Sequence, residues 1–134
     1  MKAFQVTNFD KNPTIENIPE PNPKPNQVRL KIMSCGLNFA DILLINGTYQ
    51  ETPPLPFVLG MEVSGVVDAL GSNVNKFAIG DRVAVFGGQG GLAEYGCFDL
   101  SRCVKLPQKM SFDDAAAFQI AYGTSHLVLG YKAQ

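Results

Sequence analysis

Residues 28–47 read VRLKIMSCGLNFADILLING, and their hydrophobic period changes once along the segment. Residues 28–33 alternate between apolar and charged side chains. This alternation predicts a half-buried strand in which Val28, Leu30 and Ile32 face inward. The strand should then lead almost directly into a different kind of element.

The second half of this segment has helical spacing. Residues 38–46 predict a short helix, because four apolar side chains fall on one helical stripe: Phe39, Ile42, Leu43 and Ile45. Gly47 can end the helix, because glycine adopts the left-handed backbone that closes many helices.

On both sides of this segment the pattern is mostly that of short strands. Proline-rich or glycine-rich loops separate them at residues 19–27, 48–60, 71–73 and 87–91. Gly65 lies inside one strand and indicates a close backbone approach or a bend. The expected strands are Lys2–Phe9, Thr14–Ile18, Val63–Leu70, Asp81–Phe86, Leu92–Phe98 and Cys103–Leu106.

A long helix is expected only near the end of the chain. The run S-F-D-D, residues 111–114, resembles a capping box in which Asp114 replaces the usual Glu. Alanines follow, and Gly123 is a candidate break. Because strands and helices do not alternate, the order favours a mainly β fold, a partly open antiparallel β-barrel with flanking helices.

Composition narrows the classes of function. The chain has 134 residues, of which 46% are hydrophobic and 17% are charged, and its formal net charge is −1. The few basic residues are scattered, which argues against nucleic-acid binding and against a polybasic membrane contact. The apolar runs are too short for a signal peptide or a membrane span, so we expect a cytoplasmic protein.

The three cysteines, Cys35, Cys97 and Cys103, are too few and too unevenly spaced for a disulfide framework or a metal clip. The only histidine is His126. A catalytic zinc needs about three protein ligands. We therefore expect reduced, buried thiols, no metal site, and a surface or interface position for His126.

Residues 88–93 read G-Q-G-G-L-A and match the G-x-G-x-x-A pattern of dinucleotide-binding folds. In those folds the pattern opens a helix whose N-terminus binds the pyrophosphate. Here residues typical of a strand follow, so we expect a hairpin loop instead.

Five segments, taken in order, resemble a known family: CGLNFAD (35–41), PFVLGMEVSGVV (56–67), GDRVAVF (80–86), LAEYGCF (92–98) and SFDDAAAF (111–118). Together they are similar to the N-terminal, GroES-like catalytic domain of the medium-chain dehydrogenase/reductase superfamily, and most similar to its zinc-free quinone oxidoreductase branch. The resemblance covers essentially the whole chain.

The resemblance also implies what is missing relative to the zinc alcohol dehydrogenases. Asn38 stands where those enzymes have a ligand cysteine, and Met61 stands where they have a ligand histidine. Ala40 replaces the hydroxyl of their proton relay, and the cysteine-rich structural lobe between Gly91 and Ser111 is absent. Amide and thioether groups are poor zinc ligands, so a zinc-independent enzyme is expected.

The branch implies hydride transfer from NADPH to a quinone or to an activated alkene such as an enone or enoyl compound. Asn38 matches a residue near the nicotinamide and is expected to be catalytic and cofactor-binding, although a helix N-cap is an equal alternative. Tyr49 matches a residue facing the substrate and could donate to a developing enolate. Its alternative is an exposed loop aromatic.

Three further residues are expected near the cofactor from the same resemblance. Phe39 matches the stretch bordering the cofactor, and core packing is its alternative. Asp41 belongs to the shared motif, and holding local structure is its favoured role. Thr124 matches a threonine near the nicotinamide.

The resemblance also suggests that residues 1–134 form one catalytic domain, with residues from about 111 to 134 beginning the interdomain helix region. A Rossmann domain would follow in the parent protein, which would be a homodimer, and this domain alone would be inactive. The alternative is a non-enzymatic quinone-reductase-like protein that binds or interacts without turnover.

Overall fold

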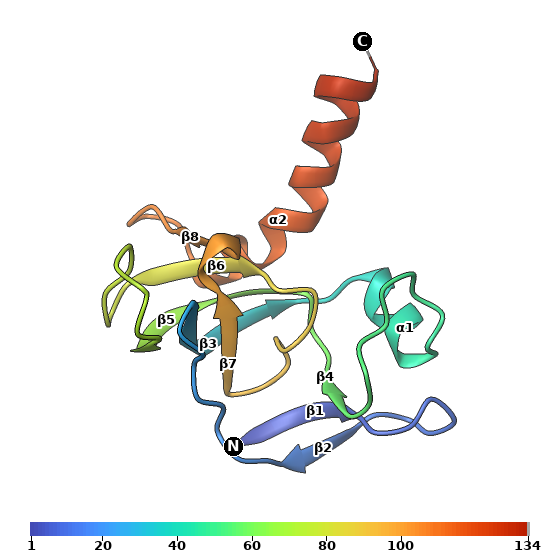
Figure 1. Cartoon of the computed structure of the whole chain (residues 1–134). Coiled ribbons are helices and arrows are strands. Elements are labelled where there is room, and N and C mark those ends of the chain that lie inside the picture. Colours follow the sequence, from blue (N-terminus) through green and yellow to red (C-terminus); the bar gives the residue numbers. More distant parts are fainter. Residues whose placement is uncertain (134) are drawn as a thin grey trace.

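The computed structural model describes residues 1–133, which form two antiparallel sheets and two helices (Figure 1). The chain begins in the smaller sheet and ends in the longer helix. The strands are β1 (Lys2–Val6), β2 (Thr14–Asn17), β3 (Gln27–Gly36), β4 (Phe57–Val58), β5 (Glu62–Leu70), β6 (Arg82–Phe86), β7 (Tyr95–Asp99) and β8 (Cys103–Lys105). The helices are α1 (Phe39–Ile45) and α2 (Phe112–Leu127); a 3-10 turn (Leu100–Arg102) precedes β8, and a π-helical turn (Val128–Lys132) continues α2.

The larger sheet has the strand order β7-β3-β5-β6-β8, and every pair in it is antiparallel. Val28 and Leu30 are fully buried in β3, as the alternating pattern predicts, and Ile32 is partly buried against the same core. This core is mostly β-branched, which suits a pleated surface. Its buried members are Val28, Leu30, Val63, Val67, Val83, Val85 and Phe98.

The smaller sheet has the order β2-β1-β4. It joins the larger body where the backbone N–H of Phe4 donates to the carbonyl of Leu92, at 2.8 Å. The expected mainly β, antiparallel and partly open fold is confirmed, as two open sheets rather than a closed barrel. β4 was not predicted, because two residues are too short to show a period.

Gly65 provides the predicted close approach between β5 and β3. A Cβ atom at this position would lie 2.3 Å from the carbonyl oxygen of Lys31. Only glycine therefore fits at this crossing.

Helix α1 has the predicted position, flanked by Asn38 and Asn46 and followed by Gly47 at φ +64°. The four residues of the apolar stripe do not share one environment, since Leu43 and Ile45 are partly buried and Ile45 packs against the core. Phe39 is 72% exposed and Ile42 is also exposed, whereas Asp41 and Leu44 are buried. Asp41 turns inward because its carboxylate accepts hydrogen bonds from the backbone N–H groups of Asn38 and Gly60. Leu44, three residues later, lies on the same side of the helix and is buried as well.

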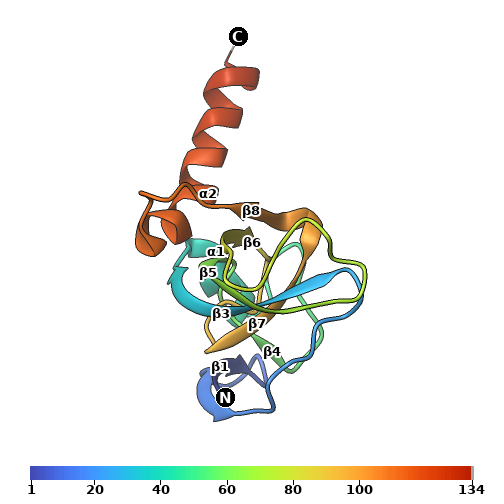
Figure 2. The same ribbon diagram turned by 90° about the vertical axis from the view of Figure 1, so that its left-hand side faces the viewer.

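Helix α2 begins as predicted after Ser111, whose hydroxyl oxygen accepts from the backbone N–H of Asp114 at 3.0 Å. The helix continues through Gly123 without the candidate break. Its first turns pack on the larger sheet, and the rest extends away from the body (Figures 1 and 2). Within residues 1–133, neither helix has the length and apolar character needed to cross a bilayer.

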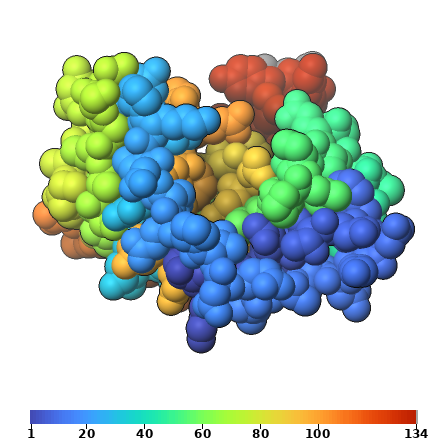
Figure 3. Space-filling view, turned by 60° about the horizontal axis from the view of Figure 1, so that its bottom comes forward, coloured from blue at the N-terminus to red at the C-terminus, as the bar shows by residue number. Residues whose placement is uncertain are grey.

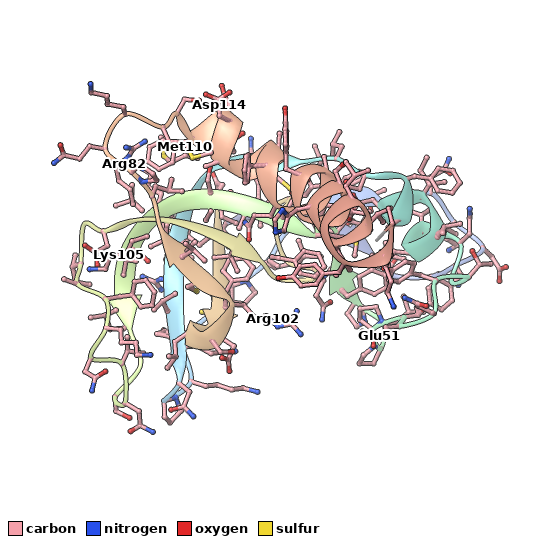
Figure 4. The ribbon with its side chains drawn as sticks, turned by 90° about the horizontal axis from the view of Figure 1, so that it is seen from above. Glu51, Arg82, Arg102, Lys105, Met110 and Asp114 are labelled. Atoms are coloured by element: carbon pink, nitrogen blue, oxygen red, sulfur yellow. The ribbon has the colours of Figure 1, made fainter. Side chains whose placement is uncertain are left out.

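Arg82 holds the segment that leads into α2. Its guanidinium donates to the carbonyl oxygens of Pro107, Gln108 and Met110 and lies 4.5 Å from the centre of the Phe112 ring. Figure 4 shows Arg82 beside Met110 at this segment. One side chain thus fixes where α2 starts relative to β6.

We expect Arg82→Lys to lower the free energy of unfolding by about 1–3 kcal/mol, because a single ammonium group cannot replace a guanidinium that donates to three carbonyl oxygens. Urea denaturation measures this change. Lys105→Met removes the exposed ion pair with Asp81 and should change stability by less than about 1 kcal/mol. Equal effects of the two substitutions would contradict the role given to Arg82.

Candidate active site

Glu62, the first residue of β5, is only 3% exposed and binds two other segments. Its Oε1 accepts from the side-chain amide of Asn38 at 2.9 Å, and its Oε2 accepts from the backbone N–H of Ile120 at 2.9 Å. Asn38 caps α1, and Ile120 lies in the middle of α2. One buried carboxylate therefore connects both helices to the sheet.

Asp41 forms a second buried carboxylate site beside it. Its oxygens accept from the backbone N–H of Asn38 at 2.9 Å and of Gly60 at 3.2 Å. Burial raises the pKa of Asp41 and the nearby Glu62 charge adds to this, while the two backbone donors oppose it. These bonds fix the start of α1 against the segment that precedes β5.

A pocket of about 400 Å³ opens between the elements that Glu62 connects. Ala40 of α1, Tyr49 of the following loop and Met61 line one part of it, with Phe86 at the end of β6. Helix α2 supplies the remaining lining residues: Gln119, Ile120, Gly123, Thr124 and Leu127. The pocket is mainly apolar, with a few polar groups, as small-molecule sites usually are.

The structure brings two of the expected site residues together, because Tyr49 and Thr124 line this same pocket. Asn38 lies next to it as the N-cap of α1, with its amide bound to Glu62. Phe39 is exposed, so the alternative of core packing for this residue is wrong. Asp41 has the structural role that was favoured for it. The cofactor contacts of Asn38, Phe39, Asp41 and Thr124, and the substrate contact of Tyr49, stay predictions.

The two positions that would hold zinc do not offer zinc ligands. The amide nitrogen of Asn38 donates a hydrogen bond to Glu62 and has no lone pair to offer. Met61 is a buried thioether on the pocket wall. Within residues 1–133 no three His, Cys, Asp or Glu side chains gather in a way that could hold a metal ion.

Cys35 does not resemble a nucleophile. Its thiol donates to the carbonyl of Gly36, and burial, with the charges of Asp41 and Glu62, raises its pKa to about 12. Burial likewise raises the pKa of Cys97 to about 11 and that of Cys103 to about 12. All three cysteines are free and partly buried, so they are thiols at neutral pH.

The G-Q-G-G-L-A segment follows β6 and leads into β7, so no helix opens after it, as predicted. Gly88 and Gly90 have positive φ values, as tight turns require. The segment borders a separate hollow of about 270 Å³, which Glu51 and Arg102 also line. Figure 3 shows this hollow between the green segment before β4 and the ochre segment after β6, and Figure 4 shows Glu51 and Arg102 on its two sides.

Sequence reasoning missed two residues of the site. Glu62 opens a strongly apolar strand, and a charged residue at such a position is a signal for a buried partner. Gln119 is a polar residue between Phe118 and Ile120 in an alanine-rich helix. The period of the strand at Glu62, or of the helix at Gln119, does not by itself show what each side chain contacts.

Residues 24–108 match the family described as "Alcohol dehydrogenase GroES-like domain". A "Quinone oxidoreductase-like protein 2 homolog" of Nematostella vectensis is 49% identical over 109 residues, which are 81% of this chain and 30% of that protein. The chain thus spans less than a third of this relative.

Solved structures show the same fold. The human synaptic vesicle membrane protein VAT-1 homolog-like protein superposes with a TM-score of 0.90 at 32% identity, over 99% of this chain and 43% of that one. The quinone oxidoreductase of Thermus thermophilus, whose structure was also determined in complex with NADPH, gives 0.84 at 35% identity, over 97% of this chain and 40% of that one.

We expect Asn38→Ala to lower the free energy of unfolding by about 1–3 kcal/mol. The substitution leaves Oε1 of the buried Glu62 without its side-chain donor. Glu62→Gln should also destabilise, because its new amide must face one of two donors. Chemical denaturation measures both effects.

Asn22→Ala serves as the matched control, since Asn22 lies exposed in the proline-rich loop. This control should stay within about 0.5 kcal/mol of the unchanged protein. If Asn38→Ala were as harmless as the control, Glu62 would not be the connection described above.

A second prediction concerns pH and the thiol of Cys35. Alkylation requires the thiolate, so at about pH 8.5 iodoacetamide should label Cys35 far more slowly in the folded than in the unfolded protein. An unfolded thiol ionises near its ordinary value of 9.0 and the folded one near 12. Between these values the folded state binds more protons, so the free energy of unfolding should fall as the pH rises.

Mass spectrometry of labelled peptides measures the first effect, and denaturation at several alkaline pH values measures the second. Cys35→Ala should remove this residue's part of the slope, while Cys97 and Cys103 keep theirs. Rapid labelling of Cys35 in the folded protein would show a thiolate and contradict the assignment.

Proposed function

The chain belongs to the alcohol dehydrogenase GroES-like domain family and, within the medium-chain dehydrogenases/reductases, to the zinc-free quinone oxidoreductase branch. On that basis we propose that it is the substrate-side domain of a zinc-independent, NADPH-dependent reductase of quinones or activated alkenes. The observation that supports the proposal is the apolar pocket that both Tyr49 and Thr124 line. Met61 occupies the wall where the zinc enzymes have a histidine.

We further propose that a Rossmann domain adjoins α2 in the whole protein. The outer part of α2 and the π-helical turn carry a run of exposed apolar residues, which is costly in water unless another unit covers it. These residues are Phe118, Tyr122, Leu127, Val128, Leu129 and Tyr131. In this proposal residues 1–134 are one catalytic domain of a homodimeric, cytoplasmic enzyme, and the isolated domain is inactive because it lacks the unit that binds most of the cofactor.

NADPH, when bound, would supply the hydride, and the chain's own residues would shape its place. Gly123 has open space where a Cβ atom would stand, which leaves room for a flat ring beside Thr124. The Thr124 hydroxyl can hydrogen-bond a carboxamide. Asn38, Phe39 and Asp41 stand around the N-terminus of α1, and we propose that they border the same cofactor.

The acceptor would lie in the pocket with its carbonyl oxygen toward Tyr49. Reduction of a quinone places negative charge on that oxygen, and the Tyr49 hydroxyl can donate a hydrogen bond to it as the charge develops. With the pocket covered by the second domain, the apolar walls at Met61, Phe86 and Ile120 would keep water away from this bond and so strengthen it. Little further acid–base assistance is needed for such an acceptor.

A second candidate is a protein that binds a ligand or partner without turnover. The likeness to the human synaptic vesicle membrane protein VAT-1 homolog-like protein favours it. The two candidates differ in one measurable property, which is oxidation of the nicotinamide in the presence of an acceptor.

The test uses the full-length protein and follows oxidation of NADPH and NADH by a benzoquinone, a naphthoquinone and an enone, with and without a chelator. Oxidation of an alcohol with NADP is measured as well, because this is the reaction of the zinc-dependent alcohol dehydrogenases. We expect chelator-insensitive turnover of quinone or enone only. Tyr49→Phe should lower kcat by roughly 10–100-fold, because it removes the donor to the developing charge.

Tyr95→Phe is the matched control, since Tyr95 lies in β7 beside Arg29 and not in the pocket. Its kcat should be unchanged. NADPH binding without turnover of any acceptor would favour the second candidate, and an unchanged kcat in Tyr49→Phe would remove Tyr49 from the mechanism.

A further inference from the structure

The side chain of Gln119 has an unusual position in α2. Its Nε2 atom is buried and has no hydrogen-bond partner within residues 1–133, and no other side-chain nitrogen or oxygen there is both buried and unpaired. A buried donor without an acceptor destabilises a fold, and native structures contain few of them. The position therefore calls for a physical explanation.

Gln119 lines the pocket that also contains Tyr49 and Thr124. It also lines a neighbouring apolar pocket of about 330 Å³ between α2 and β8. Gly123 follows one helical turn later and lines both spaces, with no atom within 4 Å of the place where its Cβ would be. The residue thus lines both spaces while the protein covers its Nε2 atom, and a rotation of the flexible side chain would present this N–H to a ligand in the pocket.

The neighbours of Gln119 do not satisfy it. Ala115, Ile120 and Met110 offer apolar side chains on the two pockets, and leucine or methionine at position 119 would fill the same space without an unpaired donor. A glutamine here is an advantage only when something entering the pocket brings an acceptor oxygen.

We propose that Gln119 is a specificity-determining residue of the pocket, whose amide N–H donates to a carbonyl oxygen of the bound acceptor. The proposal rests on the function proposed above for this pocket. Because Tyr49 supplies a second donor to the same space, the ligand class that uses both is a neutral ring with two carbonyl oxygens, which is a quinone. An acceptor with a single carbonyl group leaves one donor unpaired.

The experiment measures binding and thermal unfolding in the full-length protein, and it does not depend on turnover. The probe is duroquinone, whose methylated ring does not add thiols, and the comparison ligand is durene, the same ring without the oxygens. Gln119→Leu and Gln119→Met should each weaken duroquinone binding by roughly tenfold, the effect of one hydrogen bond. Durene binding should be unchanged or tighter.

The Tm without ligand provides a second readout. Replacing a glutamine that only supports the structure would lower this Tm, whereas replacing one with an unpaired buried donor should raise it. Both substitutions should raise the Tm without ligand, because they remove an unsatisfied buried donor. Gln108→Leu, in the exposed loop before α2, is the matched control and should change neither the Tm nor the affinity. A lower Tm in both variants would show that the amide is already bonded and would overturn the proposal.

Unchanged duroquinone affinity in both variants would overturn it as well. A failure of the role given to Gln119 can be distinguished from a failure of the proposed function. Weaker duroquinone binding in a protein that turns over no acceptor would support the role of Gln119 and contradict the enzyme. Quinone turnover with unchanged affinity in the Gln119 variants would support the enzyme and contradict this role.

Discussion

The rest of the site depends on the hydrogen bonds to the buried carboxylate of Glu62. A buried charge is costly unless hydrogen-bond donors stabilise it. Glu62 meets this requirement with a side-chain donor from the start of α1 and a backbone donor from the middle of α2. Because each bond fixes direction as well as distance, both helices are held at defined positions over the end of β5. The pocket is the space left between them.

The chemistry available in that space follows from which residues the helices present. Met61 adjoins Glu62 in sequence and faces the pocket, so the wall that could have carried a ligand histidine is an apolar thioether. Asn38 is turned toward Glu62 and serves the architecture. The polar lining residues come from farther away along the chain, with Tyr49 after α1 and Gln119 and Thr124 on α2; in the proposals above these residues supply the donors for a ligand oxygen. A site with these roles would orient and polarise a ligand and would leave the hydride transfer to a cofactor.

Two more arrangements support the position of α2. Arg82 binds the carbonyl groups that precede the helix, and the Ser64 hydroxyl donates to the carbonyl of Phe112 in its first turn. The small residues Ala115 and Ala116 are buried at the sheet. These contacts secure only the first half of the helix, so the polar groups of the pocket lie where the well-packed body gives way to an exposed apolar surface.

The sequence by itself determined the order of the elements and all the longer ones, but not the two-residue strand β4. Alternation predicted β3 and the burial of Val28 and Leu30, glycine and proline marked the loops, and the segment around CGLNFAD placed α1 correctly, because these signals depend on neighbours a few residues apart. The tertiary structure alone decided which side of α1 faces the core, that β4 pairs with β1, and that Glu62 joins residues 24 and 58 positions away. The physical reason is that a buried polar group chooses its orientation by its hydrogen-bond partner. That partner is brought near only by the fold.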